Sequence, residues 1–468
     1  MSRPLLWLVA ALLAQPLTLL EAAEAPRPNV IYILADDLGY TDVGWHGDEI
    51  KTPHLDKLAA GGAKLEQFYV QPVCSPTRAA LMTGRYPMRH GLQVGVVRPW
   101  AEHGLPLEER TLPAALKEAG YQTAMTGKWH LGHFRPEYLP TRRGFDHQYG
   151  HYNGALDYFT HDRDGGHDWH RDDKVSRDEG YSTELVGNEA VKRIKERDKS
   201  KPLFLYVPFN AVHAPLQALE KDLQKYAHIQ EKKRRTYCAM MSCLDDQVGK
   251  IVAAVDDEKI RDNTLIMFSS DNGGPLGLGA TNGNLRAGKG SLYEGGVRVC
   301  ALANWPGKIK AGTVIEEPLH IVDVFPTVLT LAGAKLEQKL PLDGLDAWGT
   351  IAGGQKTPHK EILHNTTSTT GAIRMGDWKL ILNGNAPVDD VETSGDPVRR
   401  RGRQAASVEL FNIREDRSEK NNLAEKNPEK VKELKARYDE LAAEAVPPKN
   451  SPKPKDFQVP KVWGEAGQ

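Results

Sequence analysis

The chain has 468 residues, of which 40% are hydrophobic and 26% are charged, close to the average of soluble globular proteins. These values exclude a collagen-like or wholly disordered chain, and the length predicts one large domain with a smaller one. Lys and Arg number 61 against 62 Asp and Glu, a net charge of −1. With no overall positive field to hold a polyanion, we expect no nucleic-acid partner.

The first 25 residues predict an export signal. Arg3 precedes an apolar run from Leu5 to Leu20, and small residues follow it. The run is shorter than the roughly 18 apolar residues that a membrane span needs. We therefore expect cleavage near Ala23 or Ala25, and a periplasmic or secreted protein without stable membrane insertion.

Residues 26–355 alternate apolar, β-branched runs with amphipathic stretches. This alternation predicts an α/β domain built around a large, mostly parallel sheet. Sites in such sheets form beyond the carboxyl ends of the strands, so the polar residues that follow each run are the candidates for chemistry. The predicted strands are 30–34, 123–126, 203–207, 265–268 and 299–303, and the predicted helices are 55–60, 112–119, 184–196 and 234–255.

Acidic side chains follow two of these runs. Asp36 and Asp37 close the first, and Asp271 and Asn272 follow the run 265–268. Adjacent carboxylates repel each other unless a cation or donors lie between them, and hard oxygen ligands suit Ca²⁺ or Mg²⁺. An acidic pair can also be an ordinary cap or turn, so the metal interpretation depends on the two strand ends meeting.

Cys74 lies at the start of a predicted helix. Ser75 has the character of a cap and Pro76 of a first helical residue, which would place the thiol at the positive end of the helix dipole. Arg78 lies within one turn of it. From these residues alone, Cys74 is a reactive thiol or a merely tolerated one.

The other three cysteines are predicted to be buried small hydrophobic residues. Cys238 and Cys243 lie in one predicted helix, where five positions place their Cα atoms roughly 8 to 9 Å apart, too far for a disulfide. Cys300 lies in an apolar run.

Four basic side chains complete the candidates. Lys128 and His130 alternate along an extended segment and could share one face. His213 follows the run 203–207, and Lys289 lies in a glycine-rich segment that could approach a ligand closely. Each alone is more often ordinary surface.

Two polar segments are expected to be solvated. His161, His167 and His170 could be considered as a zinc site, but their spacing lacks the regularity of known sites, and a solvated, substrate-facing loop is favoured. The basic run 232–235 is predicted to be a solvated helix face.

From residue 356 to 446 the pattern predicts a small α+β subdomain. Strands are predicted at 372–374, 378–382 and 410–412, a solvated loop at 387–404, and a helix with Asn427 as cap and Pro428 at its first position. Its apolar face is Val431, Leu434, Tyr438 and Leu441. The Pro-rich tail 447–468 is predicted to be extended or mobile.

The pattern Cys74-x-Pro76-x-Arg78, with Thr83-Gly84 downstream, resembles the first motif of the formylglycine-dependent sulfatases of the alkaline phosphatase superfamily. The stretch Gly120 to Gly132 is similar to their second motif. The resemblance covers nearly all of the mature chain, and segments such as 212–217 and 341–344 are most similar to the arylsulfatase B, or N-acetylgalactosamine-4-sulfatase, type. The residues that match in order are Asp36, Asp37, Cys74, Arg78, Lys128, His130, His213, Asp271, Asn272 and Lys289.

The resemblance implies an alkaline-phosphatase-like α/β sandwich that hydrolyses sulfate esters. It implies that a formylglycine-generating or maturase enzyme oxidises Cys74 to formylglycine, and that residue 74 shares a Ca²⁺ with Asp36, Asp37, Asp271 and Asn272. The hydrated aldehyde would attack sulfur, give a covalent sulfate ester and then expel sulfate. Arg78 would hold the hydrate, Lys128 and Lys289 would neutralise the sulfuryl oxygens, His213 would protonate the leaving oxygen, and His130 would take the second hydroxyl proton.

Two alternatives remain open at this point. The same metal and lysines tolerate a phosphate or phosphonate ester, and the protein would be a non-catalytic glycan-binding protein if Cys74 stayed unmodified. The expected partner is a sulfated carbohydrate, with a galactose or galactosamine sulfate resting on overall similarity alone. The sequence gives no indication of oligomeric state.

Overall fold

The computed structural model describes residues 27–364, 367–384, 407–450 and 452–465. The predicted export signal, residues 1–25, and the predicted loop 387–404 lie outside the described residues. In the part of the chain that is described, no helix combines the length and the apolar character needed to cross a lipid bilayer.

A large sheet forms the centre of the molecule, and its middle five strands, β11, β1, β10, β4 and β5, run parallel. This confirms the predicted fold class. The sheet order is β14 (Thr313–Ile315), β2 (Ala63–Leu65), β13 (Ala301–Asn304), β11 (Thr264–Ser270), β1 (Asn29–Ala35), β10 (Leu203–Pro208), β4 (Gln122–Lys128), β5 (His147–His151), β8 (His170–Arg171) and β9 (Lys174–Val175).

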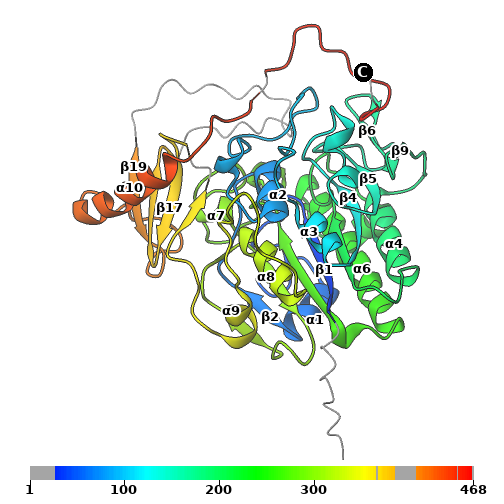
Figure 1. The fold of residues 1–468 in the computed structure, drawn as a ribbon, viewed down its shortest axis with the longest axis horizontal. Helices are drawn as coiled ribbons and strands as arrows, with labels where there is room; N and C mark the ends of the chain where they lie inside the picture. Colours follow the sequence, from blue (N-terminus) through cyan, green and yellow to red (C-terminus); the bar gives the residue numbers. More distant parts are fainter. Residues whose placement is uncertain (1–26, 365–366, 385–406, 451, 466–468) are drawn as a thin grey trace, which may run out of the picture.

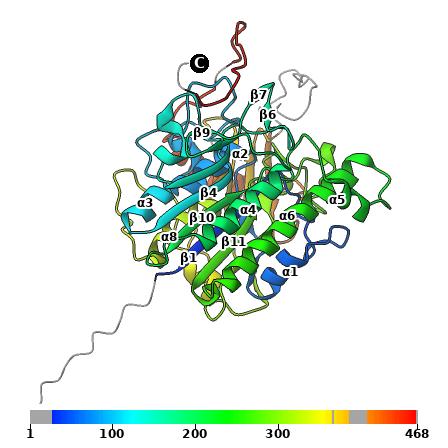
Figure 2. The same cartoon turned by 90° about the vertical axis from the view of Figure 1, so that its right-hand side faces the viewer.

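Helices cover both faces of this sheet. Strand β1 is fully buried, and its side chains alternate between two hydrophobic cores. One core includes α2 (Cys74–Thr83), α3 (Leu112–Glu118) and α8 (Val324–Leu331), and the other includes α1 (Pro53–Ala60), α4 (Ser182–Lys195) and α6 (Lys232–Asp257). Figure 2 shows α4 and α6 lying over the second face. The remaining helices are α5 (Glu220–Lys225), α7 (Glu294–Val297) and α9 (Trp348–Gly353).

The predicted strand 299–303 is wrong as a single element. The chain passes at Cys300 from β12 (Arg298–Val299) to β13. Strand β12 belongs to a second sheet with β3 (Phe68–Tyr69) and β15 (Leu319–His320), whereas β13 belongs to the large one. Both pieces are buried, and residues 299–303 are apolar throughout, so the run carries no signal of the change of sheet.

Helix α2 begins two residues earlier than predicted. Its cap is Val73, in extended conformation, and Cys74 is already within the first turn. Ser75 is therefore a helical residue and not the cap. The cysteines of α6, Cys238 and Cys243, are buried free thiols, and so is Cys300, as predicted.

A small antiparallel sheet with one helix follows near the C-terminus, at the left of Figure 1. Leu434 and Tyr438 of the helix are buried as predicted. Asn427 occupies the N-cap position as predicted, but its side chain accepts no hydrogen bond from the first turn, and its amide donates instead to the carbonyl of Leu423. The elements are β16 (Ile362–His364), β17 (Gly371–Met375), β18 (Trp378–Leu382), β19 (Val408–Asn412) and α10 (Pro428–Ala442).

A buried ion cluster joins the small sheet to the large domain. Lys379 of β18 places Nζ 2.8 Å from Glu294 Oε1, at the start of α7, and 3.0 Å from Glu419 Oε1. All three side chains are fully buried. Glu419 also accepts the backbone N–H of Glu294, so the cluster fixes the chain just after Lys289.

Candidate active site

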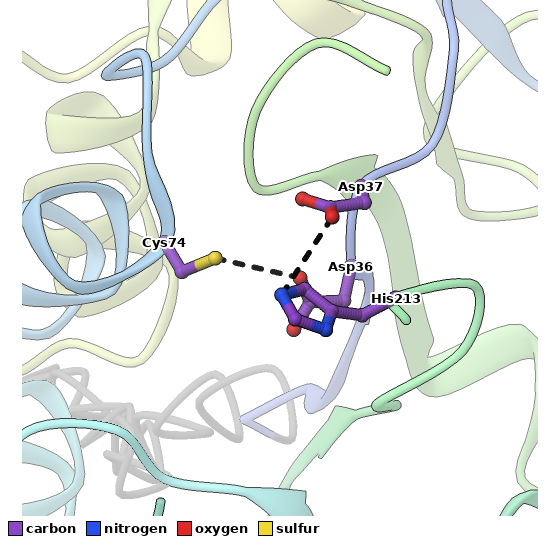
Figure 3. Close-up of side chains that lie close together, drawn as sticks. All are labelled: Asp36, Asp37, Cys74 and His213. Carbon is purple, nitrogen blue, oxygen red and sulfur yellow. Dashed lines mark hydrogen bonds and ion pairs between the residues drawn. The ribbon is translucent and has the colours of Figure 1, made fainter. Parts of the chain in front are cut away.

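Polar side chains from four neighbouring parallel strands meet at one edge of the sheet. Asp36 and Asp37 follow β1, Asp271 and Asn272 follow β11, Lys128 ends β4 and His213 follows β10. Because β11, β1, β10 and β4 are adjacent, their carboxyl ends bring these residues together. Figure 3 shows Cys74 of α2 pointing toward Asp36 and His213 pointing toward Asp37.

Cys74 is buried in the centre of this group. Its Sγ lies 3.4 Å from Asp36 Oδ1, and ligand atoms of Asp36, Asp37, Cys74 and His213 all lie within 4.8 Å of one another. Burial, and then the charges of Asp271 and Asp36, raise the pKa of the Cys74 thiol well above its usual range. A protonated thiol is a poor nucleophile, so this surrounding disfavours the reactive-thiol interpretation of Cys74.

Arg78 holds two of the carboxylates in place. Its Nε and Nη2 donate to Asp271 Oδ2 at 3.1 and 2.8 Å, and Nη2 also lies 3.0 Å from Asp36 Oδ2. Its Nη1 donates to the carbonyl of Lys128. One guanidinium thus joins the ends of β1, β11 and β4. Burial alone would lower the pKa of Arg78, but Asp271 and its other neighbours outweigh that effect and raise it.

The two candidate lysines also lie on carboxylates. Lys128 Nζ is 2.5 Å from Asp36 Oδ2, and Lys289 Nζ is 2.9 Å from Asp37 Oδ1. Burial opposes the charge of Lys128, but Asp36 and Cys74 outweigh it, so the pKa of Lys128 is raised and the ammonium stays charged.

The donor set fits a hard divalent cation. Asp36, Asp37 and Asp271 carry three negative charges, and Arg78, Lys128 and Lys289 carry three positive ones, so a divalent ion would leave the site positive. Asn272 donates its amide to Asp37 Oδ1 and to the carbonyl of Gly273. Its Oδ1 is buried with no hydrogen-bond partner among the described residues. An orphaned amide oxygen beside three carboxylates is the ligand set that Ca²⁺ prefers.

A close backbone approach explains the glycine after Asn272. A Cβ on Gly273 would lie 1.8 Å from the carbonyl oxygen of Gly295. The Gly273 N–H donates to the carbonyl of Gly296. The turn that carries Asp271 and Asn272 therefore lies directly against the start of α7, and a larger residue at position 273 would displace it.

Backbone bonds assign the two candidate histidines different proton positions. His213 Nδ1 lies 2.6 Å from the carbonyl oxygen of Ala214, so Nδ1 carries a proton and Nε2, 3.7 Å from Asp37 Oδ2, is the nitrogen that faces the site. His130 Nε2 donates to the carbonyl of Val97 at 3.1 Å, which leaves Nδ1 as its basic nitrogen. Burial, and then Lys128, lower the pKa of His130 well below its usual range, which keeps it a neutral base.

The predicted alternation of Lys128 and His130 holds only in part. Strand β4 ends at Lys128, and His130 has a φ of 60°. Asp37 has a φ of 62°. Residues other than glycine rarely occupy this left-handed region of backbone conformation, and such backbone strain is concentrated at functional sites. The backbone turn, and not strand periodicity, brings His130 to the site.

Sequence reasoning missed the role of Ser75. Its Oγ donates to the carbonyl of His130 at 2.8 Å and accepts the N–H of Val97 at 3.0 Å. Ser75 therefore joins α2 to the two segments that hold His130. Both partners are distant in sequence, so no local pattern could have indicated them.

The histidine-rich segment is not solvated, contrary to the prediction. The side chains of His161, His167 and His170 are all buried. His161 stacks on Trp169 and donates from Nε2 to the Gly180 carbonyl, and His167 donates from Nε2 to the Ser176 carbonyl. Since carbonyl oxygens only accept, these nitrogens are donors, which leaves them unsuited to bind a metal. The three histidines are absent from the metal-like cluster found among the described residues.

Comparisons with known proteins place the chain among sulfatases. A family model described as Sulfatase matches residues 28–334. Arylsulfatase J of Mus musculus is 40% identical over 92% of this chain and 78% of its own length, and arylsulfatase A of Homo sapiens is 35% identical over 88% and 87%. N-acetylgalactosamine-6-sulfatase of Canis lupus familiaris is 36% identical over 77% and 73%.

Solved structures give the same result. The crystal structure of Ps i-CgsB in complex with k-i-k-neocarrahexaose superposes with a TM-score of 0.81 at 35% identity, covering 90% of this chain and 94% of that one. The PsFucS1 sulfatase from Pseudoalteromonas sp. superposes with a TM-score of 0.72 at 26% identity, covering 89% and 90%.

Proposed function

This chain belongs to the sulfatase family, whose members hydrolyse sulfate esters, and on that premise we propose that it is an exported, formylglycine-dependent and calcium-binding glycan sulfatase. One observation carries the proposal. The Sγ of Cys74, a thiol whose pKa is raised by burial, lies within 4.8 Å of the ligand atoms of two carboxylates and a histidine. An oxidised and hydrated residue 74 would supply two hydroxyls on one carbon at this place.

Asp36, Asp37, Asp271 and Asn272 would hold the calcium ion. A bound Ca²⁺ supplies positive charge that acidifies a neighbouring hydroxyl and attracts a sulfate oxygen. Arg78 keeps Asp36 and Asp271 at hydrogen-bond distance and so preserves the ligand geometry. Lys128 and Lys289, which neutralise carboxylates here, would then bind the sulfuryl oxygens of the ester.

The histidines would divide the proton transfers. His213 holds one proton at Nδ1 through Ala214, so Nε2 would act as the leaving-group acid when it carries a second proton, which it would deliver to the departing sugar oxygen and leave the ring neutral. His130 is fixed by Val97 with Nδ1 basic and would accept a proton from residue 74.

The substrate would be a sulfated polysaccharide with galactose or galactosamine units. Support comes from the N-acetylgalactosamine-6-sulfatase relatives and from the neighbour that holds k-i-k-neocarrahexaose. The basic and apolar N-terminus supports export, which N-terminal sequencing of protein from the native host would test. A formylglycine-generating or maturase enzyme would modify Cys74 during biogenesis.

The deciding experiment joins mass spectrometry to a leaving-group series. The tryptic peptide 65–78 of native-host protein should carry an aldehyde or its hydrate at position 74, and the enzyme should prefer aryl sulfates to aryl phosphates. An unmodified thiol in protein without sulfatase activity would favour glycan binding alone, and equal rates on aryl phosphate would favour the phosphate-ester alternative.

His213→Asn and His130→Asn form a matched pair of variants for the same series. Loss of a leaving-group acid costs roughly 10² to 10⁴-fold, and costs most where the leaving group is poor. His213→Asn should therefore slow an alkyl sulfate far more than a nitrophenyl sulfate, whereas His130→Asn should slow both alike. A uniform effect of His213→Asn would contradict its assigned role.

A further inference from the structure

The C-terminal tail, residues 452–465, forms a wall beside the candidate active site. In Figure 1 it leaves the α10 side of the molecule, crosses the end of the sheet where the parallel strands finish, and reaches the hairpin of β6 (Asp162–Arg163) and β7 (Gly166–His167). Two backbone hydrogen bonds of 2.9 Å fix the tail to His167. The His167 N–H donates to the Lys461 carbonyl, and the Trp463 N–H donates to the His167 carbonyl. Trp463 Nε1 donates to the carbonyl of Arg163 at 2.9 Å.

An aromatic cleft of about 320 Å³ lies between this tail and the main domain. The Phe457 ring lies 6.3 Å from Trp100 and stacks at 6.2 Å on Trp463, and Trp463 meets His133 edge to face at 5.5 Å. Phe134 is 43% exposed beside them. Glu102 and Glu465 are exposed polar groups of its lining.

A short stretch of chain connects Pro99 and Trp100 of the cleft lining to Val97, which is bonded to residues of the candidate active site. Ser75, next to Cys74, accepts the Val97 N–H, and His130 donates to the Val97 carbonyl. Val96 packs against Cys74 itself. Two residues lie between Val97 and Trp100, so three backbone steps place their Cα atoms at most about 11 Å apart.

The chemistry of the cleft suits a sugar ring. Flat aromatic faces bury the C–H face of a pyranose, and carboxylates at the edge accept its hydroxyl protons. Lys453 Nζ lies 5.4 Å from the Trp100 ring centroid and 5.6 Å from that of Phe457, where it would face a sulfate group of the same glycan.

We propose that this aromatic cleft binds a pyranose ring of the glycan chain close to the hydrolysed sulfate ester, so that the protein selects oligomeric over monomeric substrates. The inference rests on the proposed function for the identity of the ligand. It makes Trp100 and Phe457 binding residues, with the buried Trp463 supporting the Phe457 ring, and it gives the C-terminal tail a share in substrate specificity.

The test compares substrates of different length. Trp100→Ala and Phe457→Ala should lower kcat/KM on a sulfated hexasaccharide of chondroitin sulfate or carrageenan roughly 3- to 10-fold, through KM, because an aromatic contact contributes about 0.5 to 1.5 kcal/mol. Activity on nitrophenyl sulfate should stay unchanged within about twofold. Leu345→Ala, which removes an exposed apolar side chain between α8 and α9, should change neither.

Two outcomes would overturn the proposal. Unchanged hexasaccharide kinetics in both variants would show that the rings do not contact the glycan, and equal loss on nitrophenyl sulfate would assign them to the support of the active site. Calorimetric titration of the hexasaccharide into Cys74→Ala protein, with and without Trp100→Ala, separates this question from catalysis. Weaker binding in the Trp100 variant supports the cleft even if the protein hydrolyses no sulfate ester, and equal binding refutes it.

Discussion

Replacing Lys379 by methionine tests whether the buried ion cluster holds the small sheet and the Lys289 segment in place. Lys379 is the cation between Glu294 and Glu419, at 2.8 and 3.0 Å, and all three side chains are fully buried. Methionine keeps most of the volume but leaves two carboxylates without their shared partner. Removing one member of a buried pair costs about 3 to 5 kcal/mol.

The pH dependence makes this prediction sharper. Burial alone would raise the pKa of Glu294, but the charges of Lys379 and Arg298 outweigh the effect of burial and lower this pKa to about 2. Burial raises the pKa of Glu419 to about 7, with Lys379 opposing. Without the lysine both values rise. A carboxyl whose pKa is higher in the folded than in the unfolded protein stabilises the folded state most at pH values below its unfolded pKa. This stabilisation is lost as the pH rises through the folded pKa.

The loss in Lys379→Met should therefore grow with pH. At pH 5 Glu419 is protonated in both folded proteins, so it contributes little to the difference in unfolding free energy between the native protein and the variant. At this pH the difference comes mainly from Glu294. Above pH 7 the native protein ionises Glu419 but the variant must keep it protonated, which costs about 1.4 kcal/mol per pH unit. We expect Lys379→Met to lower the unfolding free energy by about 3 kcal/mol at pH 5 and by about 5 kcal/mol at pH 8.

Urea unfolding followed by near-ultraviolet circular dichroism at pH 5 and pH 8 measures both values. Lys435→Met is the matched control, since Lys435 is half exposed on α10 and its pair with Asp439 should contribute about 0.5 kcal/mol or less. A cost of Lys379→Met below about 1 kcal/mol at pH 8, or one that is equal at both pH values, would refute the reasoning.

Three further predictions follow from the site and its surroundings. Cys74→Ser should release one equivalent of alcohol per enzyme and then stop, because a sulfated serine has no second hydroxyl to expel sulfate; sustained turnover in a quench-flow assay would disprove the aldehyde route. Removal of Ca²⁺ by a chelator should abolish activity. It should also lower the unfolding free energy by about 2.7 kcal/mol, compared with protein in a hundredfold excess of Ca²⁺ over its Kd. Unchanged scanning calorimetry traces would exclude a structural ion. Burial raises the pKa of Asp245 to about 6, so stability should fall as pH rises from about 4 to 6, and Asp245→Asn should flatten that part of the urea-midpoint profile.

The strands and the long helices could be predicted because their signals are local. The runs that became β1, β10 and β11 are continuous apolar segments, and α6 has a long amphipathic period. Their polar continuations, from Asp36 to Asn272, could be placed at one sheet edge by the same reasoning. Motif resemblance added Cys74, which periodicity alone could not distinguish from the buried Cys238.

Long-range contacts determine what could not be predicted. Arg78 reaches Asp271 across 193 positions, and no local pattern assigns that partner. The histidines 161, 167 and 170 are buried because aromatic rings and the tail cover them, although their composition is that of a surface loop. The tail itself has the composition of a free segment, yet Val462 and Trp463 are buried.

The depth of Cys74 has a consequence for how the protein is produced. Only 1% of that residue is exposed once the sheet has assembled, so the oxidising enzyme that we propose would have to reach it on the nascent, still unstructured polypeptide. Oxidation and folding would then compete during synthesis, and a molecule that folds first would be well formed yet permanently inert. Overproduction should consequently raise yield while specific activity declines, with both populations melting at similar temperatures.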